Sequence, residues 1–280
     1  MSGERQIEAG IAKLRVEMSY GEYLHLDQIL GAQHPLSRPV NHDELLFIIQ
    51  HQTSELWLKL TLHELLYART CLAEDSVGPA LKALARVKHV QHQLAEQWSV
   101  LATLTPSEYA QFRGQLGTSS GFQSWQYRAV EFVLGNKSAA MVELFGHDRS
   151  AQEFLAALLG QPTLYDELLR YLARRSYPIP AEVLNRDVTL PWQLVGELVE
   201  VMADIYRDPS SHWEAYETCE ALVDIEDNFQ LWRFRHLATV RRTIGDQTGT
   251  GGSSGIGFLR AALDLSFFPE LYALRGEVGR

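Results

Sequence analysis

The feature that most constrains the fold is the spacing of apolar residues, which recur every three or four positions along nearly the whole chain. From residue 41 to about residue 72 this helical period continues through Leu45, Ile49, Leu56 and Leu60 without a proline. No run alternates apolar and polar residues as a half-buried strand would. We therefore expect an all-α fold, organised as a helical bundle.

Further helices are expected at 77–101, 106–113, 124–133, 152–159, 164–175, 192–206 and 212–242. Ser19–Glu22 and Asn41–Glu44 have the spacing of a capping box, and Thr105–Glu108 places a cap, a first-turn proline and an early acid in order. The prolines between residues 178 and 209 come without a low-complexity linker, which indicates turns inside a domain. We expect residues 1–280 to form one domain.

Composition limits the compartment and the partners. A chain of 280 residues that is 46% hydrophobic can bury a large core, and its net charge of −10 argues against nucleic acid. Cys71 and Cys219 lie far apart, which excludes a disulfide framework and fits a reducing compartment. The N-terminus lacks the apolar core of a signal peptide, and runs such as Leu45–Ile49 are too short to span a bilayer. We expect a cytoplasmic protein that binds neither nucleic acid nor a membrane.

The segment 249–255 is so rich in glycine that it predicts a loop approaching a ligand closely. A phosphate cradle is disfavoured, because no lysine follows the glycines and Ser254 stands where the last glycine of GxGxxG belongs. A helix also precedes the loop, where a dinucleotide fold needs a strand. The loop therefore indicates some other ligand, close to His236.

Two histidines, His51 and His236, lie on separate helices that are rich in apolar and aromatic residues. Either one alone is more often a packed core histidine than a ligand. Together they have what a haem pocket needs, one residue to bind iron and one to contact a distal ligand. Since there is no CxxCH motif, such a haem would be held non-covalently.

A di-iron centre is the alternative metal site. His89, His92 and Glu96 share a helix, and Glu22 with His25 forms one ExxH motif. Di-iron bundles need that motif twice, with further inward-facing glutamates. The second motif is missing, and the surroundings of His89 and His92 are typical of a solvated face.

Tyr109 and Arg113 lie one helical turn apart and project together, an arrangement that suits a carboxylate ligand. The plainer interpretation is a surface arginine packed on an aromatic ring. The nearby segment 117–128 is a second Gly/Ser loop that opens a helix and exposes free N–H groups. It is equally compatible with a simple N-cap turn.

With these pieces in place, the chain resembles the tryptophan 2,3-dioxygenase family, haem enzymes of the bacterial type. The resemblance rests on Tyr20–Leu24, His42–Trp57, Gly117–Arg128, Arg233–His236 and Gly249–Gly257, spread over nearly the whole chain. It implies an all-α fold with a b-type haem pocket, assembled as a homotetramer that is a dimer of dimers. It also implies that O2 is inserted across the indole C2–C3 bond of L-tryptophan to give N-formylkynurenine, the first step of tryptophan catabolism by the kynurenine pathway.

The resemblance also assigns roles to residues. His236 matches the proximal ligand of the ferrous haem iron, and His51 the distal, catalytic histidine that meets the indole N–H. Arg113 and Tyr109 match the pair that holds the substrate carboxylate, and Thr250 a residue near the substrate ammonium and a haem propionate. Further matches are the distal-pocket residues Phe47, Leu116, Ser120 and Gly121, the haem neighbour Trp98, and Tyr20, Tyr23 and Leu24, which lie in a segment (residues 1–30) that completes the pocket of a neighbouring subunit. Gln247 departs from the family, since many relatives have a basic residue there.

Without the resemblance, other functions stay open. A haem sensor or carrier would show the same two histidines, but it would not need Tyr109, Arg113 or the loop at Thr250. A helical scaffold would leave both Gly/Ser loops without a role. A related enzyme acting more broadly on indoleamines shares the haem chemistry, but that group is monomeric and lacks these motifs in this form.

Overall fold

The computed structural model describes residues 17–252 and 254–278, and these residues form helices, turns and loops without a strand. The expectation of an all-α fold is confirmed. The chain divides into two compact units, residues 1–35 and 36–280. Unit 1 contains α1 (Tyr20–Leu24) and α2 (Leu26–Leu30). Unit 2 contains α3 (Glu44–Ala73), α4 (Val77–Glu96), α5 (Trp98–Leu101), α6 (Pro106–Phe112), η2 (Arg113–Leu116), η3 (Gly121–Gln123), α7 (Trp125–Leu134), α8 (Ala139–Glu143), α9 (Arg149–Leu159), α10 (Leu164–Arg174), α11 (Ala181–Leu184), α12 (Gly196–Arg207), α13 (Trp213–Ile244), α14 (Ile256–Leu263), α15 (Pro269–Ala273) and η4 (Leu274–Gly276).

The described part of unit 1 contains the predicted capping box. The Ser19 hydroxyl accepts from the Glu22 N–H, and the Glu22 carboxylate accepts from the Ser19 N–H at 2.8 Å. A left-handed residue, His25 with φ of 49°, separates α1 from α2. Tyr20 and Tyr23 are 76% and 71% exposed, so this short unit presents aromatic surface instead of burying it.

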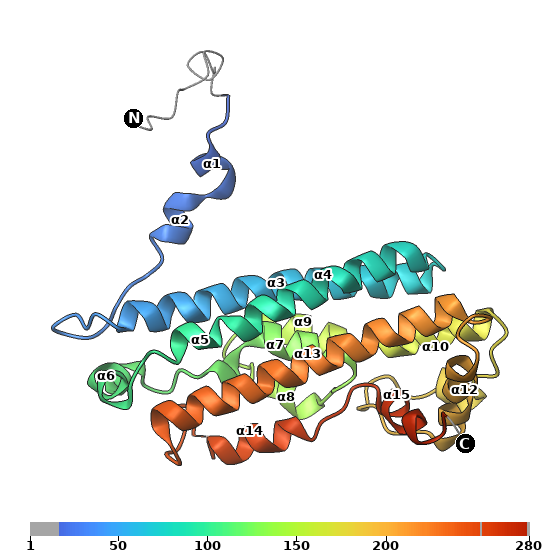
Figure 1. The fold of residues 1–280 in the computed structure, drawn as a ribbon. Coiled ribbons are helices and arrows are strands. Elements are labelled where there is room, and N and C mark those ends of the chain that lie inside the picture. Colours follow the sequence, from blue (N-terminus) through green and yellow to red (C-terminus); the bar gives the residue numbers. More distant parts are fainter. Residues whose placement is uncertain (1–16, 253, 279–280) are drawn as a thin grey trace, which may run out of the picture. The chain divides into compact units, whose positions relative to one another are not determined.

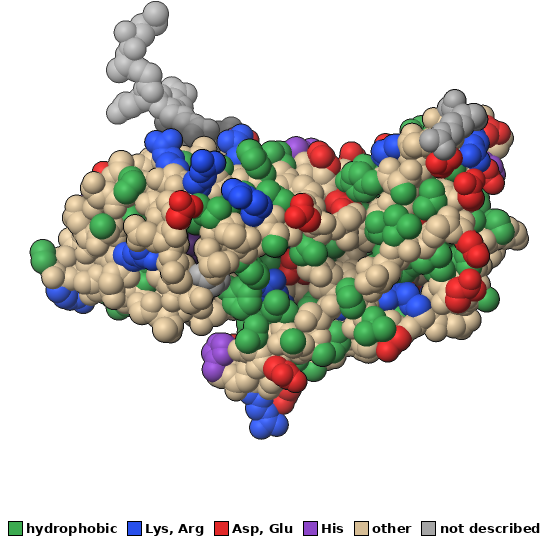
Figure 2. Space-filling model, turned by 90° about the horizontal axis from the view of Figure 1, so that it is seen from below, with side chains coloured by type: hydrophobic (Ala, Val, Ile, Leu, Met, Phe, Trp, Pro, Cys, Tyr) green, Lys and Arg blue, Asp and Glu red, His purple; other side chains and the backbone are tan. Residues whose placement is uncertain are grey.

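The frame of unit 2 is made by its three longest helices, α3, α4 and α13, which lie side by side (Figure 1). Helices α3 and α4 form an antiparallel hairpin, α13 packs along α4, and α7 and α10 pack on α3. Fully buried leucines and alanines such as Leu65, Ala68 and Leu84 line the contact faces. On the face seen in Figure 2, basic side chains are scattered among acidic and hydrophobic ones.

Two predicted helix starts are wrong, and the same physical cause explains both. The expected capping box at Asn41 does not form, because the Glu44 carboxylate accepts from the Leu36 N–H at 2.7 Å and the Ser37 N–H at 3.0 Å. The helix expected from residue 192 begins at Gly196. The buried Glu270 carboxylate holds the preceding loop by accepting from the Val195 N–H at 2.7 Å. In the first place the would-be capping carboxylate of Glu44 binds backbone N–H groups of the preceding loop, and in the second the Glu270 carboxylate reaches the backbone from 75 residues away.

The helices that sequence analysis missed are α8, α11, α14 and α15, none longer than eight residues. Two turns or fewer cannot display a convincing helical period. The expected helix 77–101 is also interrupted at Gln97, where α4 ends and α5 begins. No helix among the described residues is long and apolar enough to cross a membrane.

A buried ionic network joins α7 to α13. The Glu131 carboxylate accepts from Arg128 at 2.7 Å and from Arg233 at 2.8 Å, and all three side chains are less than 10% exposed. Arg233 also donates to the Tyr127 hydroxyl at 3.4 Å and lies over the Phe229 ring. The network therefore fixes α13 one helical turn before His236, the predicted iron ligand.

We expect Glu131→Gln to destabilise the fold by about 3–5 kcal/mol, because it leaves two buried guanidinium groups facing a neutral amide. Chemical denaturation followed by circular dichroism would measure the loss. The matched control is Glu153→Gln, which breaks an exposed pair with Arg149 and should cost less than about 1 kcal/mol. Equal effects of the two substitutions would show that the Glu131 network does not hold the helices together.

Candidate active site

A second, smaller apolar cluster lies at the end of the bundle where α3 begins. Its buried members are Trp98, Leu101, Leu104 and Phe112. The partly buried side chains that pack on it are Leu46, Phe47, Tyr109, Leu116 and Trp232. Residues from four separate parts of the chain therefore meet here, and they include predicted pocket residues (Phe47, Tyr109, Leu116) and the predicted haem neighbour Trp98.

His51 lies on α3, one turn after Phe47. Its Nδ1 is 2.7 Å from the Phe47 carbonyl oxygen, and the ring centroids of His51 and Phe47 are 4.2 Å apart. Burial lowers the pKa of His51, against the opposing effects of the Phe47 hydrogen bond and the Glu55 charge. A carbonyl can only accept, so Nδ1 carries the proton and donates it. Nε2 of the neutral ring then keeps its lone pair as an acceptor.

His236 lies on α13 and packs against two tryptophan rings, which also contact each other. Its ring stacks on Trp98 with centroids 4.6 Å apart and planes 11° from parallel, and the Trp232 centroid is 5.6 Å away. Burial lowers the pKa of His236 to about 4, and the nearby His51 adds to the effect. The imidazole is therefore neutral at physiological pH, which is the state required of a metal ligand.

Two polar groups beside His236 are unsatisfied. The indole Nε1 atoms of Trp98 and Trp232 are buried and have no hydrogen-bond partner among the described residues. Buried donors are normally paired, since leaving one unpaired costs about 1–3 kcal/mol. Apolar walls, a neutral histidine and unpaired donors together indicate a site for a large, mainly apolar group with polar substituents.

Arg113 reaches across to the glycine-rich loop. One guanidinium nitrogen donates to the Thr248 carbonyl oxygen at 2.6 Å, and the other donates to the Gln247 side-chain oxygen. Tyr109 lies one turn before Arg113, and its ring centroid is 5.8 Å from that of Phe47. Burial raises the pKa of Tyr109, opposed by the charge of Arg113, so its hydroxyl stays protonated.

The two Gly/Ser loops lie directly against each other. Thr250 donates its hydroxyl hydrogen to the Ser119 carbonyl oxygen at 2.5 Å. A Cβ on Gly251 would lie 2.7 Å from the Ser120 Cβ, so a glycine is required for this approach. The Ser120 hydroxyl itself accepts from the Phe122 N–H at 3.3 Å, as the N-cap of the short η3. The plainer interpretation of this loop, an N-cap turn, therefore describes Ser120, while Gly121 is the first residue of η3.

Some predicted residues are not members of this cluster. Tyr20, Tyr23 and Leu24 belong to unit 1 and make no part of the cluster in unit 2. His89 and His92 are exposed, which confirms the predicted solvated face. Within residues 17–252 and 254–278, no group of three or more His, Cys, Asp or Glu side chains could hold a metal ion, so the di-iron alternative finds no ligand set there.

Two features of the site were not predicted from the sequence. Trp232 was given no role, although its ring contacts the rings of both His236 and Trp98. The contact of Arg113 with Gln247 joins positions 134 residues apart, and no local pattern could signal it.

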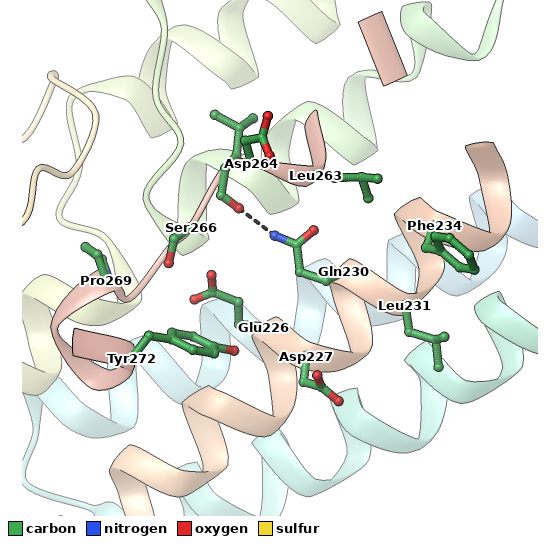
Figure 3. A pocket seen from close by; sticks show the side chains of 11 residues that line it. Glu226, Asp227, Gln230, Leu231, Phe234, Leu263, Asp264, Ser266, Pro269 and Tyr272 are labelled. Carbon is green, nitrogen blue, oxygen red and sulfur yellow. Dashed lines mark hydrogen bonds between the residues drawn. The ribbon is translucent and has the colours of Figure 1, made fainter. Parts of the chain in front are cut away.

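A separate hollow of about 640 Å³ opens on another face of α13 (Figure 3). Figure 3 shows Gln230 of α13 pointing to the segment that follows α14, where its amide donates to the Leu265 carbonyl oxygen at 2.6 Å. Leu231, Phe234 and Tyr272 around the hollow are 40%, 57% and 39% exposed. None of the predicted site residues lines it.

The family model and the similar proteins below all carry the name tryptophan 2,3-dioxygenase. The family model described as tryptophan 2,3-dioxygenase matches residues 5–154 and 193–278. The tryptophan 2,3-dioxygenase of Saccharopolyspora erythraea is 62% identical over 275 residues, covering 98% of each chain. That of Kineococcus radiotolerans is 63% identical, covering 98% of this chain and 96% of the relative, and that of Serratia proteamaculans is 56% identical over 99% of each.

Proposed function

The chain belongs to the tryptophan 2,3-dioxygenase family, and on this basis we propose that the cluster around His51, Arg113 and His236 is its active site. As a member of this family it is an oxidoreductase that oxidises L-tryptophan to N-formylkynurenine. Family membership makes it an enzyme, so the scaffold and haem-carrier alternatives lose their support. The observation that carries the proposed site is the meeting of a neutral His236, His51 and the Arg113 loop at one end of the bundle.

We assign a b-type haem to this site, with His236 as its iron ligand. The residues fit the group: the imidazole is neutral, its neighbours are aromatic, and two indole N–H groups are unpaired. Trp98, Ser120 and Gly121 would lie at the edge of the haem, and Thr250 near a propionate. When bound, haem supplies a redox-active iron at which O2, the cosubstrate, can react.

The distal residues position the indole. Phe47 and Leu116 provide an apolar wall, since both pack on the apolar cluster of α5 and α6. His51 accepts the indole N–H at Nε2, because its Nδ1–H is engaged by the Phe47 carbonyl. This fixed tautomer orients the substrate ring, and holding it in one pose lowers the entropic part of the barrier.

Charged and polar side chains hold the amino-acid end of the substrate. Arg113 offers two parallel N–H donors, the geometry that a carboxylate accepts. Tyr109 is protonated and lies one turn away, so it can donate a further hydrogen bond to the same group. Thr250, held by Ser119, lies in the same glycine-rich loop that Arg113 contacts and would contact the ammonium.

We propose that the enzyme is a homotetramer, a dimer of dimers, in which Tyr20, Tyr23 and Leu24 complete the pocket of a neighbouring subunit. The aromatic exposure of α1 supports this, as does the exposed apolar rim of the hollow on α13. We also place the protein in the cytoplasm, where its two free, buried cysteines would stay reduced.

The reaction and the iron ligand can be tested together. Anaerobic spectra of the reduced protein should show a Soret band that shifts with L-tryptophan, and air should then produce N-formylkynurenine. His236→Ala should lose the haem and all activity, whereas the exposed control His89→Ala should keep both. Normal haem content in His236→Ala would remove this residue as the ligand, and a haem protein without product would contradict the proposed reaction.

Arg113→Ala should weaken L-tryptophan binding by about 2–5 kcal/mol, because the substrate carboxylate loses both guanidinium donors. Steady-state kinetics would detect this as a raised KM. Arg113→Lys, which keeps the charge but not the two-pronged geometry, should lie between the wild type and Arg113→Ala. An unchanged KM in Arg113→Ala would exclude this residue from the substrate site.

Deletion of residues 1–26 should abolish most activity while haem stays bound. Co-expression of deleted subunits with Arg113→Ala subunits should restore activity, because the intact N-terminal segment of one subunit completes the intact pocket of another. Turnover per haem, measured on the purified mixed assembly, provides the readout. Full activity of the deletion alone, or no recovery on mixing, would contradict the shared pocket.

A further inference from the structure

We propose that Gln247 competes with the substrate carboxylate for the Arg113 guanidinium. It thereby determines which ligands can replace the contact between the loop and Arg113. The inference rests on the proposed function, because it assumes that Arg113 receives the carboxylate of tryptophan. Its own evidence is a contact that the structure shows directly, between the Arg113 guanidinium and the glycine-rich loop.

The contact reproduces the pattern of a carboxylate. An ionised carboxylate binds a guanidinium through two oxygens that accept two parallel N–H bonds. In this chain the two oxygens come from consecutive residues, the side-chain amide of Gln247 and the backbone carbonyl of Thr248. Each terminal guanidinium nitrogen thereby donates one N–H to the loop, and a substrate carboxylate can accept the N–H now bound by Gln247 only after the amide oxygen leaves.

The loop holds these oxygens in place through its glycines. Gly255 has a φ of 59° and its Cα lies so close to Gln247 that a Cβ would be 2.8 Å from the Gln247 carbonyl oxygen. Farther along, Thr250 is tied to Ser119, and Gly251 packs on Ser120. These contacts hold the backbone at residue 247, so its side chain is the part that can turn away from Arg113.

The chemistry of glutamine makes the contact reversible. A neutral amide oxygen binds a guanidinium more weakly than an ionised carboxylate does, so the substrate can displace it. A glutamate would form a lasting ion pair, and a lysine would offer no acceptor and repel the guanidinium. Gln247 is also exposed, which keeps its hydrogen bond in contact with water and further limits its strength.

Competition by Gln247 distinguishes ligands that have a carboxylate from those that lack one. A ligand with a carboxylate replaces the Gln247 contact with a stronger one, and the exchange favours binding. An indole compound without a carboxylate has no means of displacing the amide, so it must bind with the Arg113 contact intact. Gln247 therefore affects the affinity for amino acids and leaves the affinity for the corresponding amines unchanged.

The test compares two ligands on the haem-loaded enzyme, with dissociation constants measured by anaerobic spectral titration. Gln247→Ala should bind L-tryptophan about 2- to 10-fold more tightly, the value of one hydrogen bond, and should bind tryptamine as the wild type does. Gln247→Glu should bind L-tryptophan about two- to fivefold more weakly. Asp246→Ala, an exposed neighbour, is the matched control and should change neither constant.

Other results would overturn the inference. Weaker binding of L-tryptophan to Gln247→Ala would make Gln247 part of the carboxylate clamp, and an equal gain for tryptamine would indicate general loosening of the loop. Unchanged constants would leave Gln247 without a role in binding. Failure of the proposed function is distinguished by the wild type, which would then neither bind nor oxidise L-tryptophan, whatever the variants do.

Discussion

The buried carboxylate of Glu131 is the interaction on which the rest of the site depends. It is shared by Arg128 on its own helix and by Arg233 on α13, and neither guanidinium can be rehydrated without opening the core. This allows only one alignment of α13 against α7. Trp232 directly precedes Arg233 and His236 follows one turn later, so the imidazole meets Trp98 of α5 in a stacked arrangement. A hydrophobic contact alone would tolerate sliding between the helices, whereas a charge network does not.

Much of the fold could be predicted from the sequence, because its long helices carry many periods of the apolar pattern. The helix expected at 212–242 is α13, Trp213–Ile244, within two residues at each end. Prediction failed where a distant group controlled the backbone. Glu270 holds Val195 from 75 residues away, and Glu44 uses its carboxylate on Leu36 and Ser37 instead of closing a capping box. Local propensity carries no information about such partners.

In the candidate site, too, local sequence pattern predicted some features and contacts between distant residues decided others. The pairing of His51 with His236 was expected from two aromatic-rich helices, and the structure places them within electrostatic reach of each other. The sequence pattern could suggest that Arg113 binds a carboxylate, but not that Gln247 and Thr248 occupy it first. The catalytic and binding roles themselves came from family resemblance. Geometry adds the His51 tautomer, the neutral state of His236 and the unpaired indole donors around it.

The contact between Gly251 and Ser120 has a consequence for how this chain can vary. The atom that a side chain at 251 would meet is the Cβ of residue 120, which every amino acid except glycine possesses. A substitution at 251 could therefore be accommodated without moving the loop only if position 120 became glycine at the same time. Two positions 131 residues apart are thus coupled, and a change at 251 alone would separate Thr250 from Ser119.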